Sequence, residues 1–368
     1  MKYKVSYTNL NLRRLGGSAL GKITRTLLPV AILVLLAVYF LDVKDEPGLK
    51  QDKSGTPTEN HHTSVDKKED PFPAGEKSLD TIVGIRGEQV KNKFGQPDRI
   101  DPSAYGYDWW VYNQSDQHYI QVGVENGKVV TVFAFGTKLN TEPFIIGEKK
   151  DHFLKDISLD STVSLNVDGG SYQFELSEKE LNVRPLIPLN GVWAILYLDQ
   201  FTQKLAGIRY VDAKTLVKLR PYALTYRGEL ISASELSRSE WRPIEAGAEQ
   251  QIFDMTNIIR KRFGLDSLKW NEEVAKVAFQ HSKEMAVKNY FSHTSPTVGT
   301  LGDRFHNADI SYLEAGGNIA AHYTDGISAM FGWLNSKGHR KNLLHKGYTG
   351  LGVGVYQKYY TQNFIKPF

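Results

Sequence analysis

An apolar run at residues 27–41 is the feature that most constrains how this chain is organised. Its length of about 15 residues is short of the roughly 20 expected of a membrane-spanning helix, but Ile23 and two threonines extend it to residues 23–41. Basic residues precede the run and acidic residues follow it. The positive-inside rule then places residues 1–22 in the cytoplasm and everything after residue 41 outside the membrane. The pattern predicts a single-pass membrane protein.

A cleaved signal peptide is the alternative interpretation of this run. The run ends in Tyr39-Phe40-Leu41, which is bulky where a signal peptidase needs small residues. We therefore favour an uncleaved signal anchor. The chain contains no cysteine, so it has no lipoprotein attachment site and no disulfide, thiol nucleophile or cysteine-ligated metal site.

Residues 42–78 are polar and contain almost no large apolar side chain. Such a segment cannot bury enough surface to offset the entropy lost on ordering, so we expect a disordered extracellular linker. The net charge of the whole chain is only +4, and we find no basic stripe interleaved with aromatic residues. We expect no nucleic-acid partner.

Residues 79–235 are expected to form an α+β domain. Alternating apolar runs flank Asn126-Gly127, which is a strong β-hairpin signal. The triplet Ile146-Gly147-Glu148 echoes Arg86-Gly87-Glu88 about 60 residues earlier, and a second hairpin pattern follows. These echoes suggest two related units. The aromatic cluster between Tyr105 and Tyr112 is interpreted as core and strand faces rather than as a ligand platform.

A polar segment with one proline, residues 236–245, is predicted to be a linker to a carboxy-terminal domain, residues 246–368. Helical periodicity predicts a helix that ends near Phe263-Gly264 and a second that begins after Asn271. His281 lies on the apolar stripe of the second helix, which favours a place in the core. Helices followed by an antiparallel hairpin near the end of the chain indicate a layered α/β/α arrangement.

The segment 333–344 reads W-x-x-S-x-G-H-R-x-N-L-L. Gly338 is suited to the left-handed position that ends a helix, so we expect His339, Arg340 and Asn342 to lie in a short irregular turn. His293 follows a helical pattern about 50 residues upstream. Two histidines on loops that leave helices are positioned to converge on one cleft.

The carboxy-terminal residues resemble the CAP superfamily, which includes cysteine-rich secretory proteins, antigen 5 and plant pathogenesis-related proteins. The motifs that carry the resemblance, in order along the chain, are N-I-I-R at 257–260, F-S-H-T-S-P at 291–296, A-G-G-N-I-A at 315–320, the segment 333–344 and the closing strand at 359–364. The resemblance implies an α/β/α sandwich. It also implies a surface cleft lined by two histidines and two acidic residues, which binds zinc in some members.

Within that resemblance, His293 and His339 match the two histidines of the family and are the metal-ligand candidates. Asn318, Ser336 and Arg340 complete the cleft candidates. Gly317 and Ser336 stand where the family has its two acids, and two imidazoles alone leave zinc in need of two further ligands. We therefore assign no catalytic residue, and zinc is the only cofactor that the resemblance suggests.

Glu314 lies near the missing acids, but side chains three positions apart in an extended chain face opposite ways. Ser336 and His339 resemble a nucleophile and base, although no acid is placed to orient the histidine. Neither residue therefore restores a catalytic site.

Residues 79–235 resemble a domain that precedes CAP domains in Gram-positive bacteria. The likeness rests on F-G-Q-P-D-R at 94–99, on the aromatic run at 105–113 and on the hairpin from Val122 to Val130. The resemblance to that domain implies no activity for residues 79–235.

Two classes of function remain. The first is a membrane-anchored, non-enzymatic interaction module at the cell surface, whose partner is a protein or an envelope ligand. The second is a hydrolase that acts on cell-wall, peptide or nucleic-acid material through a histidine–metal centre. The missing carboxylates favour the first class.

Overall fold

The computed structural model describes residues 3–5, 77–155 and 157–368. The expected anchor, residues 23–41, and almost all of the expected linker, 42–78, lie outside the described residues. Within the described part of the chain, no helix has both the length and the apolar character that crossing a membrane requires.

The amino-terminal domain is built on a seven-stranded sheet in the order β2-β3-β4-β5-β10-β9-β8, with every neighbouring pair antiparallel. Its strands are β2 (Arg99–Pro102), β3 (Asp108–Tyr112), β4 (Ile120–Glu125), β5 (Lys128–Ala134), β8 (Leu186–Leu189), β9 (Val192–Asp199) and β10 (Lys204–Val211). The predicted hairpin joins β4 to β5, and Asn126 and Gly127 both have positive φ angles, 50° and 74°. Those angles suit a tight two-residue turn.

The two halves of this sheet repeat one arrangement around the central β5–β10 pair. The first half begins with η2 (Leu79–Ile82) and α2 (Gly87–Phe94), and the second contains α3 (Lys150–Phe153). Gly84 N donates to Val129 O and Gly147 N donates to Leu205 O, both at 2.7 Å. Each half also has a bulge in its hairpin, in β4–β5 and in β9–β10. This correspondence supports two related α+β units.

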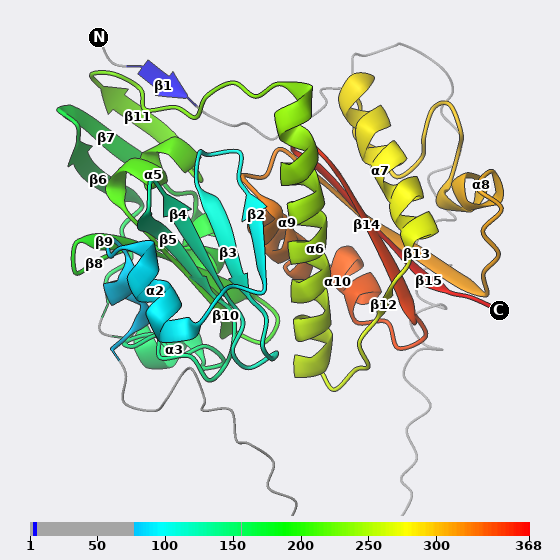
Figure 1. Cartoon of the computed structure of the whole chain (residues 1–368), viewed down its shortest axis with the longest axis horizontal. Coiled ribbons are helices and arrows are strands. Elements are labelled where there is room, and N and C mark those ends of the chain that lie inside the picture. The colour runs from blue at the N-terminus through cyan, green and yellow to red at the C-terminus, as the bar shows by residue number, and fades with distance from the viewer. Residues whose placement is uncertain (1–2, 6–76, 156) are drawn as a thin grey trace, which may run out of the picture. The chain divides into compact units, whose positions relative to one another are not determined.

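A second sheet in this domain has the order β1-β11-β7-β6. It contains β6 (Thr162–Val167), β7 (Gly170–Glu175), β11 (Ala223–Arg227) and β1 (Tyr3–Val5), with α4 (Glu178–Val183) and α5 (Ala213–Leu219) between its later strands. β1 pairs antiparallel with β11, so the described residues at the start of the chain lie on this sheet (Figure 1).

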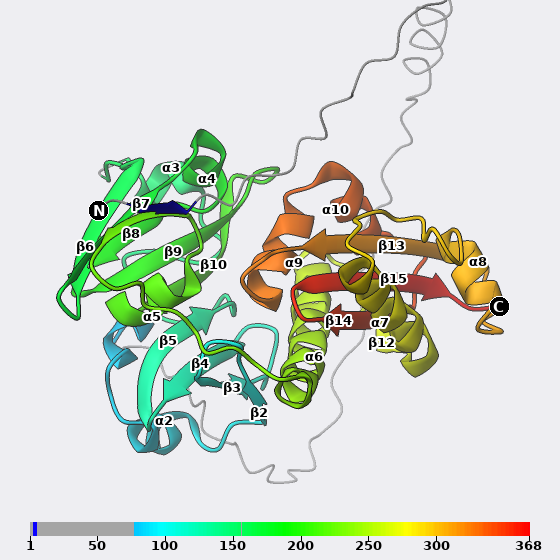
Figure 2. The ribbon, with the colours of Figure 1, turned by 90° about the horizontal axis from the view of Figure 1, so that it is seen from above.

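The carboxy-terminal domain has a four-stranded sheet in the order β12-β14-β15-β13, in which β15 lies between β14 and β13 (Figure 2). Its strands are β12 (Lys269–Trp270), β13 (Glu314–Ala321), β14 (Gly350–Tyr356) and β15 (Tyr359–Lys366). Its helices are α6 (Arg238–Arg262), α7 (Glu272–Val287), α8 (Leu301–His306), α9 (Gly326–Leu334) and α10 (Lys337–Leu343).

Helices cover both faces of this sheet, which confirms the α/β/α sandwich. On one face, α7 approaches β14 so closely that a Cβ at Gly352 or Gly354 would lie 2.2 or 1.9 Å from its backbone. On the other face, apolar side chains of α6 and α9 share one core with Leu351, Val353 and Val355.

Helix α6 begins inside the segment that was expected to be a linker. Ser237 caps it, and Ser237 and Glu240 form a capping box. Pro243 lies inside the helix, about one turn beyond its start. Residues 238–245 are therefore helical, because the cap outweighs the helix-breaking signal of the proline. α6 contacts β2 of the amino-terminal domain as well as β14 (Figure 1).

The two domains meet through an aromatic cluster. Phe331 of α9 stacks on Tyr197 of β9, with ring centroids 4.2 Å apart, and makes edge contacts with Phe133 and Phe135 of the amino-terminal domain. A Cβ on Gly207 would lie 3.0–3.2 Å from three of these rings. The cluster joins the hydrophobic cores of the two domains.

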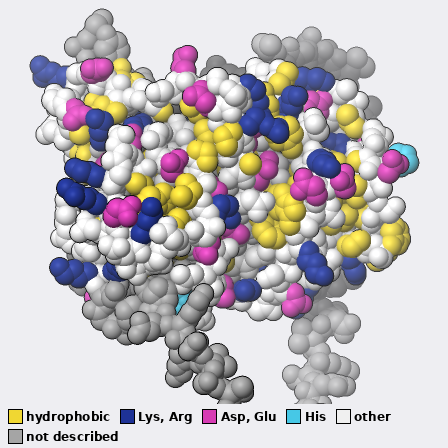
Figure 3. Space-filling view, in the orientation of Figure 1, with side chains coloured by type: hydrophobic (Ala, Val, Ile, Leu, Met, Phe, Trp, Pro, Cys, Tyr) yellow, Lys and Arg dark blue, Asp and Glu magenta, His cyan; other side chains and the backbone are white. Residues whose placement is uncertain are grey.

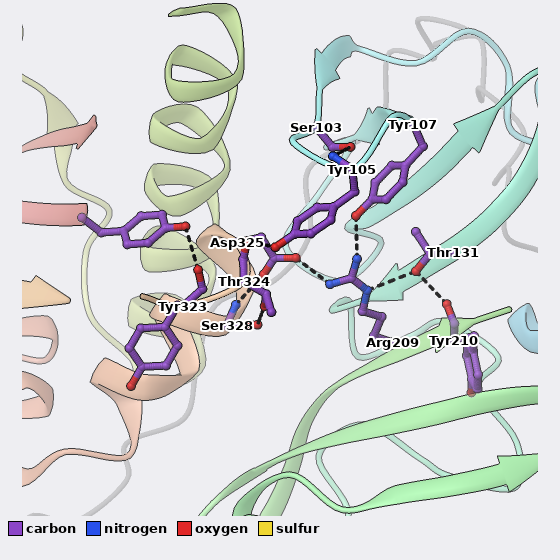
Figure 4. A network of polar contacts seen from close by, with 11 residues as sticks. Ser103, Tyr105, Tyr107, Thr131, Arg209, Tyr210, Tyr323, Thr324, Asp325 and Ser328 are labelled. Carbon is purple, nitrogen blue, oxygen red and sulfur yellow. Dashed lines mark hydrogen bonds and ion pairs between the residues drawn. The ribbon is translucent and has the colours of Figure 1, made fainter. Parts of the chain in front are cut away.

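Close to Tyr197 of this cluster lies a buried polar network around Arg209 and Asp325, which Figure 4 shows. Arg209 of β10 donates to the carboxylate of Asp325 (2.5 Å), the hydroxyl of Tyr107 (2.7 Å) and the hydroxyl of Thr131 (3.1 Å). Asp325 also caps α9 by accepting from Ser328 N at 2.9 Å. The same carboxylate therefore fixes the start of α9 and the position of the neighbouring domain.

Candidate functional site

The structure brings the two candidate histidines together. His293 lies in the loop between α7 and α8, and His339 lies in α10. Their ring centroids are 6.0 Å apart, with an angle of 38° between the ring planes. The two imidazole rings therefore lie close together, as expected from the sequence.

Both rings favour the neutral form. Desolvation lowers the pKa of His293, and the nearby Arg304 guanidinium lowers it further. Desolvation also lowers the pKa of His339, with a second contribution from His293. Near neutral pH the site therefore presents two uncharged imidazoles, each with one unprotonated nitrogen, the form that accepts a hydrogen bond or binds a ligand.

The backbone on each side of His293 is fixed by side chains from two helices. Arg304 of α8 donates to His293 O at 2.9 Å, and His281 of α7 contacts Ser292 O through Nε2 at 3.0 Å. His281 is 1% exposed, which confirms its predicted place in the core. Arg304 was missed in the sequence because nothing local links it to a loop 11 residues earlier.

His339, Arg340 and Asn342 lie in helix α10, so the prediction of an irregular turn was wrong. Gly338 does not end a helix but sits in the first turn of α10. The break lies earlier, at Asn335 and Ser336 between α9 and α10. The helical signal of the following residues outweighed a glycine near the start of the helix, where it is tolerated.

Asn318 supports the site from β13. It is fully buried, and its Nδ2 donates to His339 O at 3.2 Å and to Gln362 Oε1 at 3.1 Å. Asn342 Nδ2 donates in turn to Asn318 Oδ1 and to Gly317 O, both at 3.0 Å. Asn318 is therefore placed to hold α10, and its amide is occupied by these partners.

The positions of the two missing acids offer no replacement carboxylate. A Cβ at Gly317 would lie 3.3 Å from Oδ1 of Asn363, its partner on β15. Ser336 is the N-cap of α10, but its hydroxyl accepts no capping hydrogen bond. Glu314 is held by His345 at 3.6 Å and by Lys366 at 3.2 Å.

Asn363 is a feature of this site that the sequence did not reveal. Its side chain is fully buried, and neither amide atom has a hydrogen-bond partner within the described part of the chain. It faces the space where the side chain of residue 317 would begin. A buried amide without partners is uncommon. This one could be recognised only from the register of β13 and β15.

Arg340 points to the junction between the domains. It donates from Nη1 and Nη2 to the two oxygens of Asp199, at 2.9 and 3.0 Å, and its guanidinium lies over Phe201 and Phe263. Its charge is thus matched by Asp199, which is itself buried. The side chain binds the amino-terminal domain rather than lying beside the histidine rings.

The residues present do not fit zinc. Two imidazoles supply half of the four ligands that a tetrahedral zinc site requires. No group of three or more histidine, cysteine or acidic side chains able to hold a metal ion occurs among the residues that the structure describes. The histidine pair is therefore a surface with hydrogen-bonding capacity, without a complete set of metal ligands.

Comparisons with known proteins agree with this architecture. Residues 83–222 match the family model described as CAP-associated N-terminal, and residues 253–366 match the cysteine-rich secretory protein family. The chain is 45% identical over 339 residues to a Bacillus subtilis protein named uncharacterized membrane protein YlbC, covering 92% of this chain and 97% of the relative.

Two solved structures are also similar. An extracellular protein containing an SCP domain from Bacillus anthracis is 48% identical with a TM-score of 0.77, covering 82% of this chain and 100% of that one. A cysteine-rich secretory protein from Staphylococcus aureus is 27% identical with a TM-score of 0.69, covering 80% of this chain and 97% of that one. The chain belongs to the bacterial branch of the cysteine-rich secretory protein (CAP) family that carries the CAP-associated amino-terminal domain.

Proposed function

We propose that this protein is a membrane-anchored, extracytoplasmic binding module whose histidine pair contacts a partner without performing hydrolysis. One observation carries the proposal: His293 and His339 meet at 6.0 Å, while Gly317 and Ser336 occupy the positions of the family's acids. A general base needs a group that orients it and, in a metal site, further ligands. Among the residues that the structure describes, none around the pair supplies either of them.

The amino-terminal domain supports a binding role because it packs against the CAP domain in a fixed arrangement. Its aromatic residues Tyr105, Tyr107 and Trp109 are 5%, 2% and 2% exposed, so they belong to the core, as expected. The Phe331–Tyr197 stack and the Arg209–Asp325 pair hold the two domains in one arrangement. A partner would meet a preformed surface, which reduces the entropy lost on binding.

A histidine-dependent hydrolase acting on cell-wall, peptide or nucleic-acid material is the second candidate. The convergence of two neutral imidazoles favours it, because that pair is half of a zinc site. The two candidates differ in what the histidines bind.

A calorimetric zinc titration of the full-length chain in nonionic detergent micelles separates them, with His293→Ala and His339→Ala beside the unaltered protein. We expect no tight site and folded variants that differ at most in stability. One tight zinc site that both substitutions abolish would overturn the binding-module proposal in favour of the hydrolase. A tight site that survives both substitutions would place metal elsewhere and leave the histidine pair without it, as proposed.

The location is supported by the apolar run at residues 23–41 and by the relatives, one named a membrane protein and one an extracellular protein. The pairing of β1 with β11 stands against a cytoplasmic amino terminus. If residues 23–41 cross the membrane once, residues 3–5 and β11 lie on opposite sides of it. The anchor topology and this strand pairing cannot coexist in one molecule.

The absence of cysteine allows a direct test of the topology. Single-cysteine variants Lys283→Cys, on the exposed surface of α7, and Lys4→Cys, in β1, are treated in intact cells with a membrane-impermeant maleimide. The proposal predicts labelling at position 283 and labelling at position 4 only after the membrane is opened. Labelling of position 4 in intact cells, or protection of position 283, would overturn it.

A further inference from the structure

A pocket of about 570 Å³ lies at the junction of the two domains, beside α10. Its wall is formed by α10 and the residues that follow it, and Phe201 of the β9–β10 turn closes one side. Three lysines, Lys337, Lys341 and Lys346, line it, and all three are exposed. Three exposed lysines therefore border a pocket that is open to solvent, and the surface that lines it is mostly apolar.

Helix α10 separates this pocket from the histidine pair. Lys337, Arg340, Lys341 and Leu344 follow the spacing i, i+3, i+4 and i+7, which places them along one side of a helix. His339 falls on the other side, where its backbone meets Asn318 of β13. The pocket is a site distinct from the histidine pair.

The three lysines are not neutralised by protein carboxylates. Within the described residues none of them has an ion pair, and two acidic side chains that contact residues lining the pocket have other partners. Asp199 is bound to Arg340, and Glu314 to His345 and Lys366. On the face drawn in Figure 3, basic and acidic side chains are interspersed. Three unmatched charges in one pocket are therefore a local excess in a chain of net charge only +4.

Apolar surface makes up most of the lining of the pocket. The Arg340 guanidinium lies 4.8 Å from the ring centre of Phe201, which is 47% exposed, and both of its Nη atoms donate to Asp199. Leu344 adds apolar surface from α10. Because Phe201 and Asp199 belong to one domain and α10 to the other, only the docked pair of domains forms this pocket.

We propose that this pocket binds the phosphate group of an envelope molecule. Lysine ammonium groups act as point charges toward phosphate, and three of them around one concave surface match an anion with several equivalent oxygens. Arg340, the guanidinium that would grip a planar carboxylate in a bidentate manner, is already occupied by Asp199. The phosphate can come from a phosphodiester polymer or a lipid headgroup. That choice of sources rests on the proposed extracytoplasmic location, whereas phosphate binding itself does not.

The test uses the full-length chain in nanodiscs of zwitterionic lipid, with two phosphate probes: a soluble glycerol-phosphate oligomer and vesicles of phosphatidylglycerol. Polyglutamate of matched charge is the carboxylate control. The variant Lys337→Gln/Lys341→Gln/Lys346→Gln should weaken binding roughly tenfold, since each exposed ion pair contributes severalfold at most. Binding should also weaken as salt is raised.

The matched control Lys138→Gln/Lys179→Gln/Lys283→Gln removes the same charge from exposed positions outside the pocket and should bind as the unaltered protein does. Binding of the oligomer would identify a polymer as the source, and binding of the vesicles alone would identify a headgroup. Equal binding of polyglutamate, equal weakening in both triple variants, or no binding of either phosphate probe would overturn the proposal. Loss of binding in His293→Ala/His339→Ala would assign the phosphate to the histidine pair and overturn it as well.

Discussion

Arg209 and Asp325 form an ion pair of 2.5 Å across the junction between the two domains, with the Arg209 side chain 1% exposed. Asp325 Oδ1 caps α9 at the same time. Because the guanidinium cannot lose its proton or reach water, removing the carboxylate leaves a buried charge without a counter-ion.

Asp325→Asn should therefore lower the free energy of unfolding by about 3–5 kcal/mol, although asparagine keeps the capping oxygen. The matched control is Asp212→Asn, since Asp212 caps α5 by accepting from Thr215 N at 2.7 Å. That variant should change stability by less than about 1 kcal/mol, because asparagine and aspartate cap equally well. Urea denaturation measures both. Equal losses in the two variants would show that exchanging a capping carboxylate for an amide, and not the loss of the ion pair, is responsible.

Restoring the missing acids should create a metal site. In Gly317→Glu/Ser336→Glu the carboxylates return beside two imidazoles that already lie 6.0 Å apart, and four ligands complete a tetrahedral zinc site. The new Cβ at position 317 meets the Asn363 amide at 3.3 Å, which needs only a small shift. Calorimetry should show one zinc site in this variant, and adding His293→Ala should abolish it. A double variant that binds no zinc would mean that residues 317 and 336 do not face the histidine pair.

The stability of the protein should fall in acid because of His281. Burial lowers the pKa of His281 to about 4, and the nearby Arg304 contributes to the shift. In the unfolded chain the pKa is near 6.5, so between about pH 6.5 and pH 4 the unfolded state binds a proton that the native state refuses. This contribution to the free energy of unfolding is therefore fully present above about pH 6.5, and up to about 3 kcal/mol of it is lost as the pH falls to 4.

His281→Gln keeps a donor for Ser292 O and removes the titration. The difference in unfolding free energy between the two proteins, followed by denaturation from pH 7.5 to pH 4, isolates His281 because all other groups are shared. A difference that stays constant with pH would contradict the assignment.

Two glycines should respond in opposite ways to alanine. At Gly207 a methyl group would lie 3.0–3.2 Å from Phe331, Phe135 and Phe133, and overpacking of this kind costs about 1–3 kcal/mol. At Gly338, inside α10, a methyl group would meet nothing within 4 Å. Gly338→Ala should stabilise the protein by about 0.4–1 kcal/mol, because alanine restricts the unfolded chain. Thermal unfolding distinguishes the two signs, and a stabilised Gly207→Ala would show that the aromatic cluster has room to spare.

Local signals in the sequence predicted local structure well. The Asn126-Gly127 turn, the apolar stripe of α7 and the layered carboxy-terminal domain all follow from patterns within a few residues of one another. The errors also have local causes: Pro243 and Gly338 were read as breaks, although a capping box begins α6 and α10 continues through its glycine.

Contacts between distant residues could not be predicted. Arg340 and Asp199 are 141 positions apart, and neither belongs to a pattern that names the other. The same is true of the unpartnered Asn363 beside Gly317, which depends on the register of two strands. The resemblance to a family indicated which histidines meet, but only the packing of the second domain explains what Arg340 does.

Helix α6 has a consequence for how this protein can be divided. It runs for 25 residues without interruption and contacts both domains, and a Cβ at Gly247 within it would lie 2.6 Å from Asp101 of β2. A CAP unit recombined into another protein without its neighbour would carry Phe331 and the Asp325 carboxylate onto an open surface. Transfer of this unit to another protein is therefore constrained. Either the amino-terminal domain is transferred together with it, or the residues of α9 that face that domain must be substituted at the same time.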